Sequence, residues 1–285
     1  YQRGDVLIAN IRPYLKKVWF ADIDGGASSD VLVFRAKEGH SPSFLYAVLL
    51  QNSFFDYVMQ GAKGSKMPRG DKEQILRYEM PTLSCSEESI GTFFLNLDQK
   101  IRLNEQINQN LTAMAKQLYD YWFVQFDFPN EEGKPYKSSG GEMVWNEKLR
   151  KDIPEYWEVK SLSNWLEIKS GFPFKSETYK PIGRYKIITI KNVQDGELVT
   201  SGCDYVNEIP SRAKDYISLQ IGDRLISLTG NCGRLCVVCE ENLLLNQRVG
   251  LLCCDAIYLE YFYNFLNSST MRTAVSYTHL TLPTT

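Results

Sequence analysis

The chain has 285 residues, of which 44% are apolar and 23% charged, and its formal net charge is −2. This length suffices for two ordinary hydrophobic cores. The nearly neutral net charge argues against a surface that is basic all over and coats nucleic acid, but it is compatible with local basic patches. No run of about 18 apolar residues could span a bilayer and no signal-peptide layout opens the chain, so we expect a cytoplasmic protein that contacts no membrane.

The two ends of the chain repeat one pattern. GDVLI at 4–8 recurs as GDRLI at 222–226, and the offset of 218 holds without a gap through Val31 and Val249. With a two-residue slip, FLYAVLLQNSFFDYV at 44–58 lies over EYFYNFLNSSTMRTA at 260–274. The pattern predicts a duplicated module. Because the second copy carries roughly 60 residues ahead of Gly222 that the first copy lacks, we expect a fragment without the start of its first module.

The first module is predicted to contain strands and loops from Gly4 to about Arg35. Ser41 and Pro42 form an N-cap and a first helical position, and they open a helix that should run to about Met59. The loop GAKGSKMPRGDK at 61–72 is rich in glycine and cations. A short strand from about Tyr78 to Leu83 is expected to close the module.

A long helix is predicted from about Cys85 to Gln125, roughly 60 Å at ~1.5 Å per residue. Ser84 and Glu87 form a capping box, and Gly91 is the one glycine or proline before Pro129. A nearly regular 4-3 spacing, typical of a coiled coil, joins Ile90, Phe94, Leu97, Ile101, Asn104, Asn108, Leu111, Met114, Leu118 and Tyr121.

We call the line of 4-3 spaced residues the seam of the helix. A single helix cannot bury this seam on its own. Its partner is either a missing C-terminal helix or another protein, and the alternative is a long core helix inside one domain. The polar seam residues Asn104 and Asn108 suit a paired coil better than a sealed core. The partner contacts are expected at Leu97, Ile101, Ile107, Leu111, Met114 and Leu118.

Past the helix, PNEEGKPYKSSGGEM at 129–143 is typical of a turn-rich linker. In the second module, KIITI at 186–190 is a predicted strand, and 222–228 and 235–238 form a strand pair around a glycine turn. A last helix is expected from about Tyr258 to Val275. The final SYTHLTLPTT resembles adapter sequence and is set aside. We therefore expect an α+β protein with two duplicated α/β modules, divided as 1–84, 85–126 (long spacer helix), 127–152 (linker), 153–275 and 276–285 (non-native tail).

The spacing of Cys232, Cys236 and Cys239 could hold an iron-sulfur cluster. These residues lie in GNCGRLCVVC, a pattern that indicates a tight turn followed by a strand, where a thiol serves as a small hydrophobe. The first copy cannot supply such a ligand set, because its equivalent positions hold Tyr14, Val18 and Ala21. We expect free cysteines in a reducing compartment and no metal.

One stretch carries a family resemblance. LYDYWFVQFDFPNEEGKPYKSSGGEMVWNEKLRKDIPEYWEVKSL at 118–162 resembles the central conserved region of specificity subunits from type I restriction-modification systems. KSGFPFKSETY at 169–179, GDRLISLTGNCGRL at 222–235 and NQRVGLL at 246–252 resemble the target-recognition domain that follows that region. The resemblance covers nearly the whole chain apart from the tail.

This resemblance implies two target-recognition domains, each reading half of a bipartite site in double-stranded DNA. It also implies a coil of two antiparallel helices that spaces the domains and docks the modification (methyltransferase) subunits, with restriction subunits as further partners. The chain departs from the family by lacking the first half of the first domain and the second spacer helix.

A reader of duplex DNA needs cations for phosphates and polar side chains for base edges. Half-sites about one helical turn apart, ~10 bp, present the same face of the duplex, so a rigid rod between two readers converts spacing into specificity. The candidates in the first module are Arg12, Lys16, Lys17, Lys63, Lys66, Arg69 and Lys72. Those in the second are Lys169, Lys175, Lys191, Asn192, Thr229, Asn231, Arg234, Asn246, Gln247 and Arg248.

The sequence offers few residues and motifs that could support catalysis. Its two histidines are His40, in a loop, and His279, in the tail, and there is no phosphate-binding loop or amino-methyltransferase tetrapeptide. We therefore predict no catalytic residue and no cofactor. Two alternatives stay open: a DNA-reading segment of a fused restriction-modification enzyme, and a coiled-coil scaffold that does not bind DNA.

Overall fold

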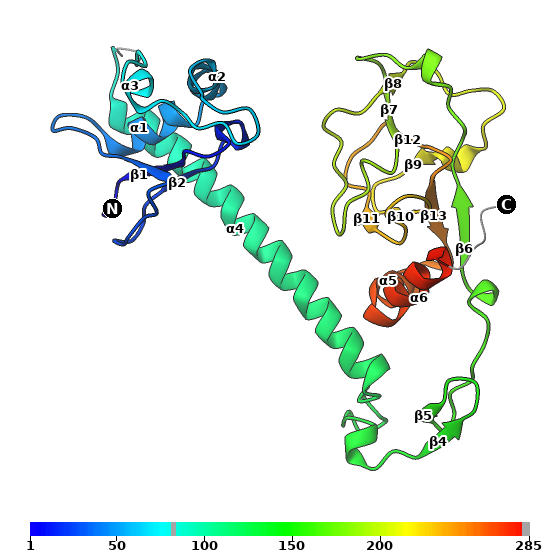
Figure 1. Cartoon of the computed structure of the whole chain (residues 1–285). Coiled ribbons are helices and arrows are strands. Elements are labelled where there is room, and N and C mark those ends of the chain that lie inside the picture. Colours follow the sequence, from blue (N-terminus) through cyan, green and yellow to red (C-terminus); the bar gives the residue numbers. More distant parts are fainter. Residues whose placement is uncertain (81–83, 281–285) are drawn as a thin grey trace. The chain divides into compact units, whose positions relative to one another are not determined.

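The computed structural model describes residues 1–80 and 84–280 (Figure 1). Within these ranges it describes side chains up to Ala274. The chain divides into two compact units, Tyr1–Leu111 and Thr112–Thr285. The fold is α+β, with one long helix and several small sheets, as the sequence predicts. No helix within the described ranges is long and apolar enough to cross a membrane.

The first unit is built on an antiparallel sheet. β1 (Val6–Ala9) lies between β2 (Val18–Phe20) and β3 (Val31–Phe34), which confirms the strands predicted for this segment. Helices α1 (Pro42–Leu49) and α2 (Asn52–Gln60) complete the core, in which Tyr46, Phe54 and Phe55 are at most 1% exposed. Buried aromatic rings remove large apolar areas from water, so these three contribute to the stability of the core.

The helix predicted from Ser41 to Met59 is two helices. Ser41 caps α1 as expected, its hydroxyl accepting from the Phe44 amide at 3.4 Å, but the chain is extended at Gln51 (ψ 144°), so the helix restarts at Asn52. Apolar periodicity runs across the break, which is why the pattern did not reveal it.

A strand at Tyr78 is also contradicted. The short helix α3 (Lys72–Ile75) precedes it, the Tyr78 amide donates to the Ile75 carbonyl at 3.1 Å, and no strand follows up to Met80. The Tyr78 ring instead packs edge-on against Phe54. The rest of that predicted strand, 81–83, lies outside the described residues.

The long helix is confirmed. α4 (Glu87–Tyr119) has 33 residues and continues into a π-helical turn, η2 (Asp120–Val124). The predicted capping box is wrong: the Ser86 hydroxyl accepts from the Ser89 amide at 3.3 Å, while the Glu87 carboxylate accepts from the Ser41 amide at 3.0 Å. Near its start α4 lies against α1, and a Cβ on Gly91 would come within 2.2 Å of the Phe44 amide nitrogen (Figure 1).

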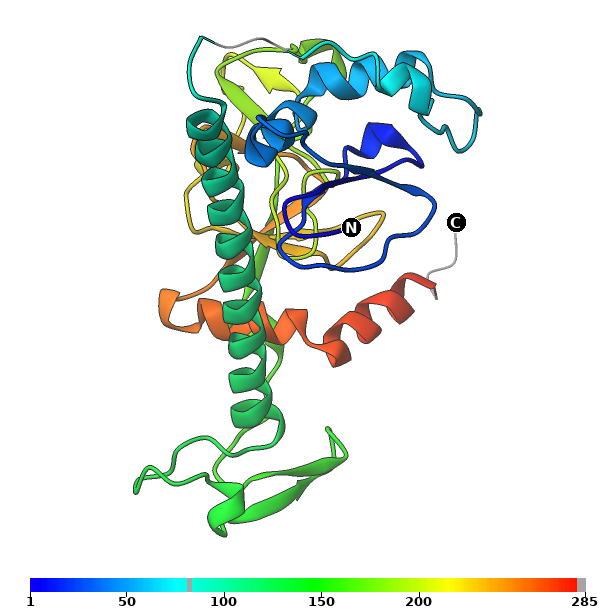
Figure 2. The same ribbon diagram turned by 90° about the vertical axis from the view of Figure 1, so that its left-hand side faces the viewer.

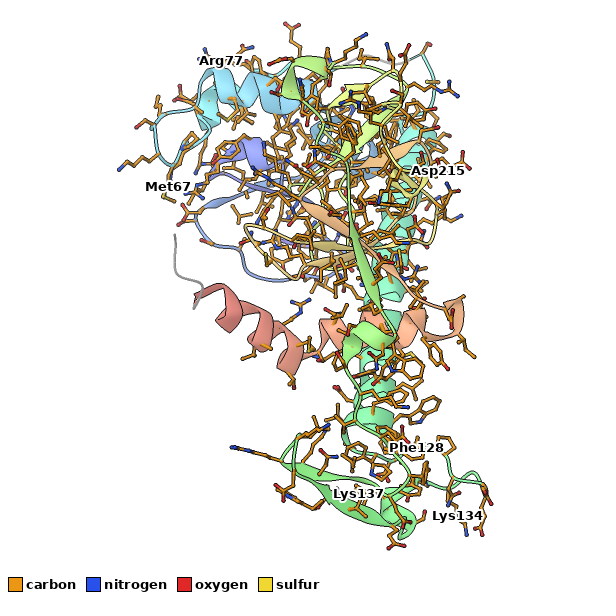
Figure 3. All side chains as sticks on the ribbon, turned by 90° about the vertical axis from the view of Figure 1, so that its right-hand side faces the viewer. Met67, Arg77, Phe128, Lys134, Lys137 and Asp215 are labelled. Atoms are coloured by element: carbon orange, nitrogen blue, oxygen red, sulfur yellow. The ribbon has the colours of Figure 1, made fainter. Side chains whose placement is uncertain are left out.

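The segment predicted as a linker contains an ordered hairpin. β4 (Met143–Asn146) pairs with β5 (Lys151–Pro154), and the 3-10 turn η3 (Lys137–Ser139) precedes them. Phe128, labelled in Figure 3, stacks on Tyr136 at 4.9 Å and on Trp157 at 5.4 Å between ring centroids. These aromatic contacts give a segment rich in turn residues a small core of its own.

The second unit has two four-stranded sheets. In the first, β10 (Arg224–Ser227) lies between β11 (Leu235–Val237) and β13 (Val249–Cys253), and β6 (Glu167–Ser170) flanks β13. The second has the order β8 (Tyr205–Val206), β7 (Tyr185–Ile188), β12 (Leu243–Leu245), β9 (Ser218–Leu219). Short 3-10 turns lie at η4 (Leu162–Asn164), η5 (Ser176–Thr178) and η6 (Asp215–Ile217). The predicted strands near 186–190, 222–228 and 235–238 are confirmed.

Two helices end the chain where one was predicted. α5 (Ala256–Asn267) and α6 (Ser269–Leu280), orange to red in Figure 2, follow each other with a bend between them. The bend falls at Ser268, whose backbone is extended (ψ 151°). α6 runs into the terminal segment that had been set aside, and 281–285 lie outside the described residues.

The three-stranded core of each unit has matching topology at the offset seen in the sequence. The order β2-β1-β3 matches β11-β10-β13, and Leu7 pairs with Val33 as Leu225 pairs with Leu251. The turns before β1 and β10 also match, because Asp5 accepts from the Gln2 amide at 2.8 Å and Asp223 from the Gln220 amide at 2.8 Å. The pairing of β11 with β10 is shifted by one residue relative to that of β2 with β1.

Candidate nucleic-acid interface

The connection between β1 and β2 presents three of the predicted cations. It forms the 3-10 turn η1 (Pro13–Leu15), flanked by Arg12 (φ 53°) and Lys16 (φ 51°) in the left-handed region. Both side chains and that of Lys17 are exposed. The Lys16 ammonium donates to the Asn52 side chain at 2.6 Å, which ties the turn to the start of α2.

The cationic loop at 61–72 is a narrow hairpin seated against that connection. The amides of Lys63 and Arg69 each donate to the other's carbonyl at 2.9 Å, and the Arg12 amide donates to the Pro68 carbonyl at 2.8 Å. Lys66 lies exposed in the loop beside Met67, which lies at the outer edge of the first unit (Figure 3). Lys72 is exposed at the start of α3.

Two sequence-distant groups of cations thus meet on one surface. We call this surface the first basic cluster and define it by Arg12, Lys16, Lys17, Lys63, Lys66 and Arg69. Two of its cations are paired within the chain, because Lys63 contacts Asp71 at 2.6 Å and Arg69 contacts Asp30 at 3.1 Å. The hydrogen bond to Asp71 raises the pKa of Lys63, so this ammonium stays charged. Neither carboxylate was singled out from the sequence.

In the second unit, two turns bring predicted residues together. The turn at 228–234 joins β10 to β11, the turn at 246–248 joins β12 to β13, and the Leu228 amide donates to the Arg248 carbonyl at 3.0 Å. Their exposed side chains include Thr229, Asn231, Gln247 and Arg248. With Arg234, which donates to the Gln194 side chain at 2.7 Å, they form what we call the second turn cluster.

Ser227 holds this cluster in shape and was missed in the sequence. Its buried hydroxyl donates to the Asn231 carbonyl at 2.6 Å and accepts from the Arg234 amide at 3.0 Å. The serine therefore fixes the turn that displays Asn231. Its signal was a small polar residue at the end of an apolar strand, just before glycine and asparagine.

Two predicted base readers instead face inward. The Asn192 side chain is buried, accepts from the Thr189 amide at 2.9 Å and donates to the Val199 carbonyl at 2.9 Å. Asn246 is also buried, and its oxygen accepts from the Arg248 amide at 3.4 Å. Both side chains therefore shape turns instead of facing solvent.

The remaining lysines lie apart from these turns in sequence. Lys169, on β6, contacts Glu167 at 3.4 Å and lies 5.6 Å from the centroid of the Tyr216 ring. Lys175 and Lys191 are exposed in loops that precede η5 and follow β7. Exposed loop cations of this kind can contact phosphate without having a fixed geometry.

The predicted seam of α4 is open along its length. Leu97, Ile101, Ile107, Leu111, Met114 and Leu118 are between 45% and 62% exposed. At the far end the helix packs, because Tyr119 lies 5.8 Å and Phe123 4.8 Å from the Tyr261 ring on α5. An apolar stripe of this length in water favours pairing with another helix.

Comparisons with known proteins agree on one family. No family model matches the chain. The chain is 28% identical over 182 residues to the type I restriction enzyme MjaIX specificity subunit of Methanocaldococcus jannaschii, covering 63% of this chain and 39% of that protein. It is 31% identical over 136 residues to the HindI specificity subunit of Haemophilus influenzae, covering 44% and 29%. The chain is a homologue of type I restriction enzyme specificity subunits.

The fold agrees with this relationship. The S subunit of a type I restriction-modification system from M. genitalium superposes with a TM-score of 0.55 at 13% identity, over 97% of this chain and 66% of that one. The homologue described here spans less than two fifths of the length of either curated relative.

The cysteines of this specificity-subunit homologue are free thiols. Burial raises the pKa of Cys236 to about 12, so its thiol is protonated and neutral at ordinary pH. Among the residues described, no group of three or more His, Cys, Asp or Glu side chains is placed to hold a metal ion.

Proposed function

We propose that this chain is the DNA-reading part of a type I specificity subunit, and that its two units each contain one of two duplicated target-recognition domains. Each domain reads half of a bipartite target in double-stranded DNA. One observation carries the proposal. The first basic cluster includes residues of the β1–β2 connection, and the second turn cluster includes residues of the β10–β11 connection. Candidate DNA contacts therefore lie on equivalent connections of the two matching sheets. The offset of 218 residues relates these two connections.

The proposed domains follow from the repeat. Residues 1–84 form the C-terminal part of the first recognition domain, 85–126 the spacer helix, 127–152 the connection and 153–275 the second recognition domain. The matching pairs Leu7–Val33 and Leu225–Leu251 support the duplication. The hairpin β4–β5 gives the connection defined structure, which makes it more than a flexible tether.

The two clusters suggest a division of labour. Lysines and arginines of the first basic cluster suit phosphate oxygens, which fix register and orientation but carry no sequence information. In the second turn cluster, Asn231, Gln247 and Arg248 carry side chains that can make bidentate contacts to adenine or guanine edges.

The spacer helix is the proposed docking element. Its open apolar seam would pair with a second helix, and the resulting coil would hold methyltransferase subunits and, through them, restriction subunits. We propose no catalytic role for the chain. It determines which DNA sequence is bound, and the partner subunits carry out methyl transfer and cleavage.

The test is to sequence methylated sites in a host that expresses the complete gene with its methyltransferase subunit. We expect one bipartite motif whose two specified halves have their centres about one helical turn apart, ~10 bp, with unspecified bases between them. Deleting the gene should abolish that methylation. Methylation that persists without it, or a continuous unipartite motif, would contradict the proposal.

A further inference from the structure

The first basic cluster carries its own counterions. Lys63 and Arg69, two cations proposed to contact phosphate, contact the carboxylates of Asp71 and Asp30 at 2.6 and 3.1 Å. Both cations remain accessible, with side chains 82% and 58% exposed. A phosphate that takes the paired donor atoms at either position would therefore displace a carboxylate.

The two carboxylates differ in what else they do. Asp71 caps α3, accepting from the amides of Glu73 at 3.0 Å and Gln74 at 3.3 Å, so it has a structural role besides its pairing with Lys63. The Asp30 side chain is 44% exposed, and its one ion pair among the described residues is with Arg69. Packing and capping do not require a charge at Asp30.

The repeat gives a second, independent observation. Asp30 immediately precedes β3, and Arg248 immediately precedes β13, at the offset of 218 residues. The second unit thus carries a cation, without an ion pair among the described residues, where the first unit carries a carboxylate. The same backbone position adds positive charge to one proposed DNA surface and removes it from the other.

We propose that Asp30 is an internal competitor of phosphate that lowers the sequence-independent DNA affinity of the first unit. This inference rests on the proposed function. An exposed ion pair contributes at most about 1 kcal/mol, so DNA can break the pair with Arg69 at a modest cost that applies to every sequence. Base contacts elsewhere then determine a larger share of where the protein stays bound.

The test compares Asp30→Asn with wild type in the complete subunit bound to its methyltransferase partner. Binding to a duplex without the target is measured by fluorescence anisotropy at several salt concentrations. We expect Asp30→Asn to tighten this binding roughly two- to fivefold, the range that a surface ion pair of up to ~1 kcal/mol allows. Asp56→Asn is the matched control, because Asp56 is exposed on α2 in the same unit and forms no ion pair among the described residues.

A double-mutant cycle isolates the pair. In an Arg69→Ala background, Asp30→Asn should have no more effect than Asp56→Asn, because its partner is gone. An equal gain for Asp30→Asn and Asp56→Asn, an unchanged affinity, or the same gain without Arg69 would overturn the inference. A wild-type complex that binds no DNA would instead contradict the proposed function, so the two failures are distinguishable.

Discussion

The hydroxyl of Tyr46 on α1 donates to the carboxylate of Asp98 on α4 at 2.9 Å. Arg102, one turn further along α4, contacts the same carboxylate at 2.8 Å and donates to the Tyr46 hydroxyl at 3.2 Å. Burial and then the hydrogen bond to Asp98 raise the pKa of Tyr46 to about 12, so the phenol keeps its proton at ordinary pH. The first half of α4 is therefore attached to α1 by a specific polar network and not by apolar contact alone.

Removing that hydroxyl should weaken the attachment. Tyr46→Phe is expected to lower the free energy of unfolding of the first unit by about 1 to 2 kcal/mol, because the hydroxyl is buried and its partner is charged. Urea denaturation followed by circular dichroism measures the change. Tyr14→Phe, at an exposed ring in η1, is the matched control and should be nearly neutral. Equal stability of the two variants would contradict a stabilising role for the network.

Gly91 lies where α4 closely approaches α1. We therefore expect Gly91→Ala to destabilise the protein, although helix propensity alone would predict stabilisation. Alanine is favoured over glycine in helix interiors by about 1 kcal/mol, so Gly91→Ala would stabilise an isolated α4. Here the new methyl group would meet the backbone of α1, and we expect a lower melting temperature instead. Gln106→Ala, exposed in the middle of α4, should change it little. A stabilised Gly91→Ala protein would show that α4 does not pack on α1 as described.

Acid should weaken the first unit through Asp5. This carboxylate is 1% exposed, and Arg35, at 2.7 Å, lowers its pKa to about 2. Because the folded pKa lies below the ordinary value, the stabilisation is complete above about pH 5 and is lost as the pH falls towards 2. With allowance for the exposed arginine, about 1 to 2 kcal/mol should disappear over that window.

Thermal unfolding between pH 2 and pH 7 measures this change in stability. Asp5→Asn should flatten the pH dependence of the first unit. The equivalent Asp223→Asn is the control, because Asp223 accepts a matching backbone bond and forms no ion pair among the described residues. An Asp5→Asn protein with an unchanged pH profile would show that this pair contributes nothing.

The seam of α4 should be required for association with the methyltransferase subunit. Leu111→Asp places a charge in the apolar stripe and should abolish association with the methyltransferase subunit or with a supplied second spacer helix. Gln106→Asp introduces the same charge on the opposite face and should leave co-purification intact. If both variants co-purify equally well, the coiled-coil role of this helix is wrong.

The cationic loop at 61–72 should contribute equally to the binding of all DNA sequences. In the complete complex, Lys66→Ala combined with Arg69→Ala should weaken binding to target and non-target duplexes by the same factor. The slope of log affinity against log salt should become shallower by about 1 for each phosphate that the variant no longer neutralises. Weaker binding to the target alone would instead make these residues base readers.

The repeat explains what the sequence could predict. It aligned the strands of the two sheets, because an apolar strand flanked by glycine turns leaves the same pattern in both copies. The helix breaks at Gln51 and Ser268 were missed, because apolar residues keep helical spacing across both. The cation groups were found, but the Asp30–Arg69 pair joins residues far apart in the chain, and no local pattern marks such a pair.

Side-chain direction was also beyond the sequence. Asn192 and Asn231 both follow strands in polar, turn-like segments, yet one is buried with its amide fully engaged and the other is exposed. What separates them is which turn each asparagine closes, and that depends on neighbours from other strands.

We propose above all that each unit reads its own half of one bipartite target. The most direct measurement is the methylated motif produced by the complete complex carrying Arg248→Ala, compared with wild type by sequencing of modified sites. We expect relaxed preference in one half-site, by about 1 to 3 kcal/mol at the affected base, with the other half-site and the spacing unchanged. Equal relaxation of both half-sites would contradict it.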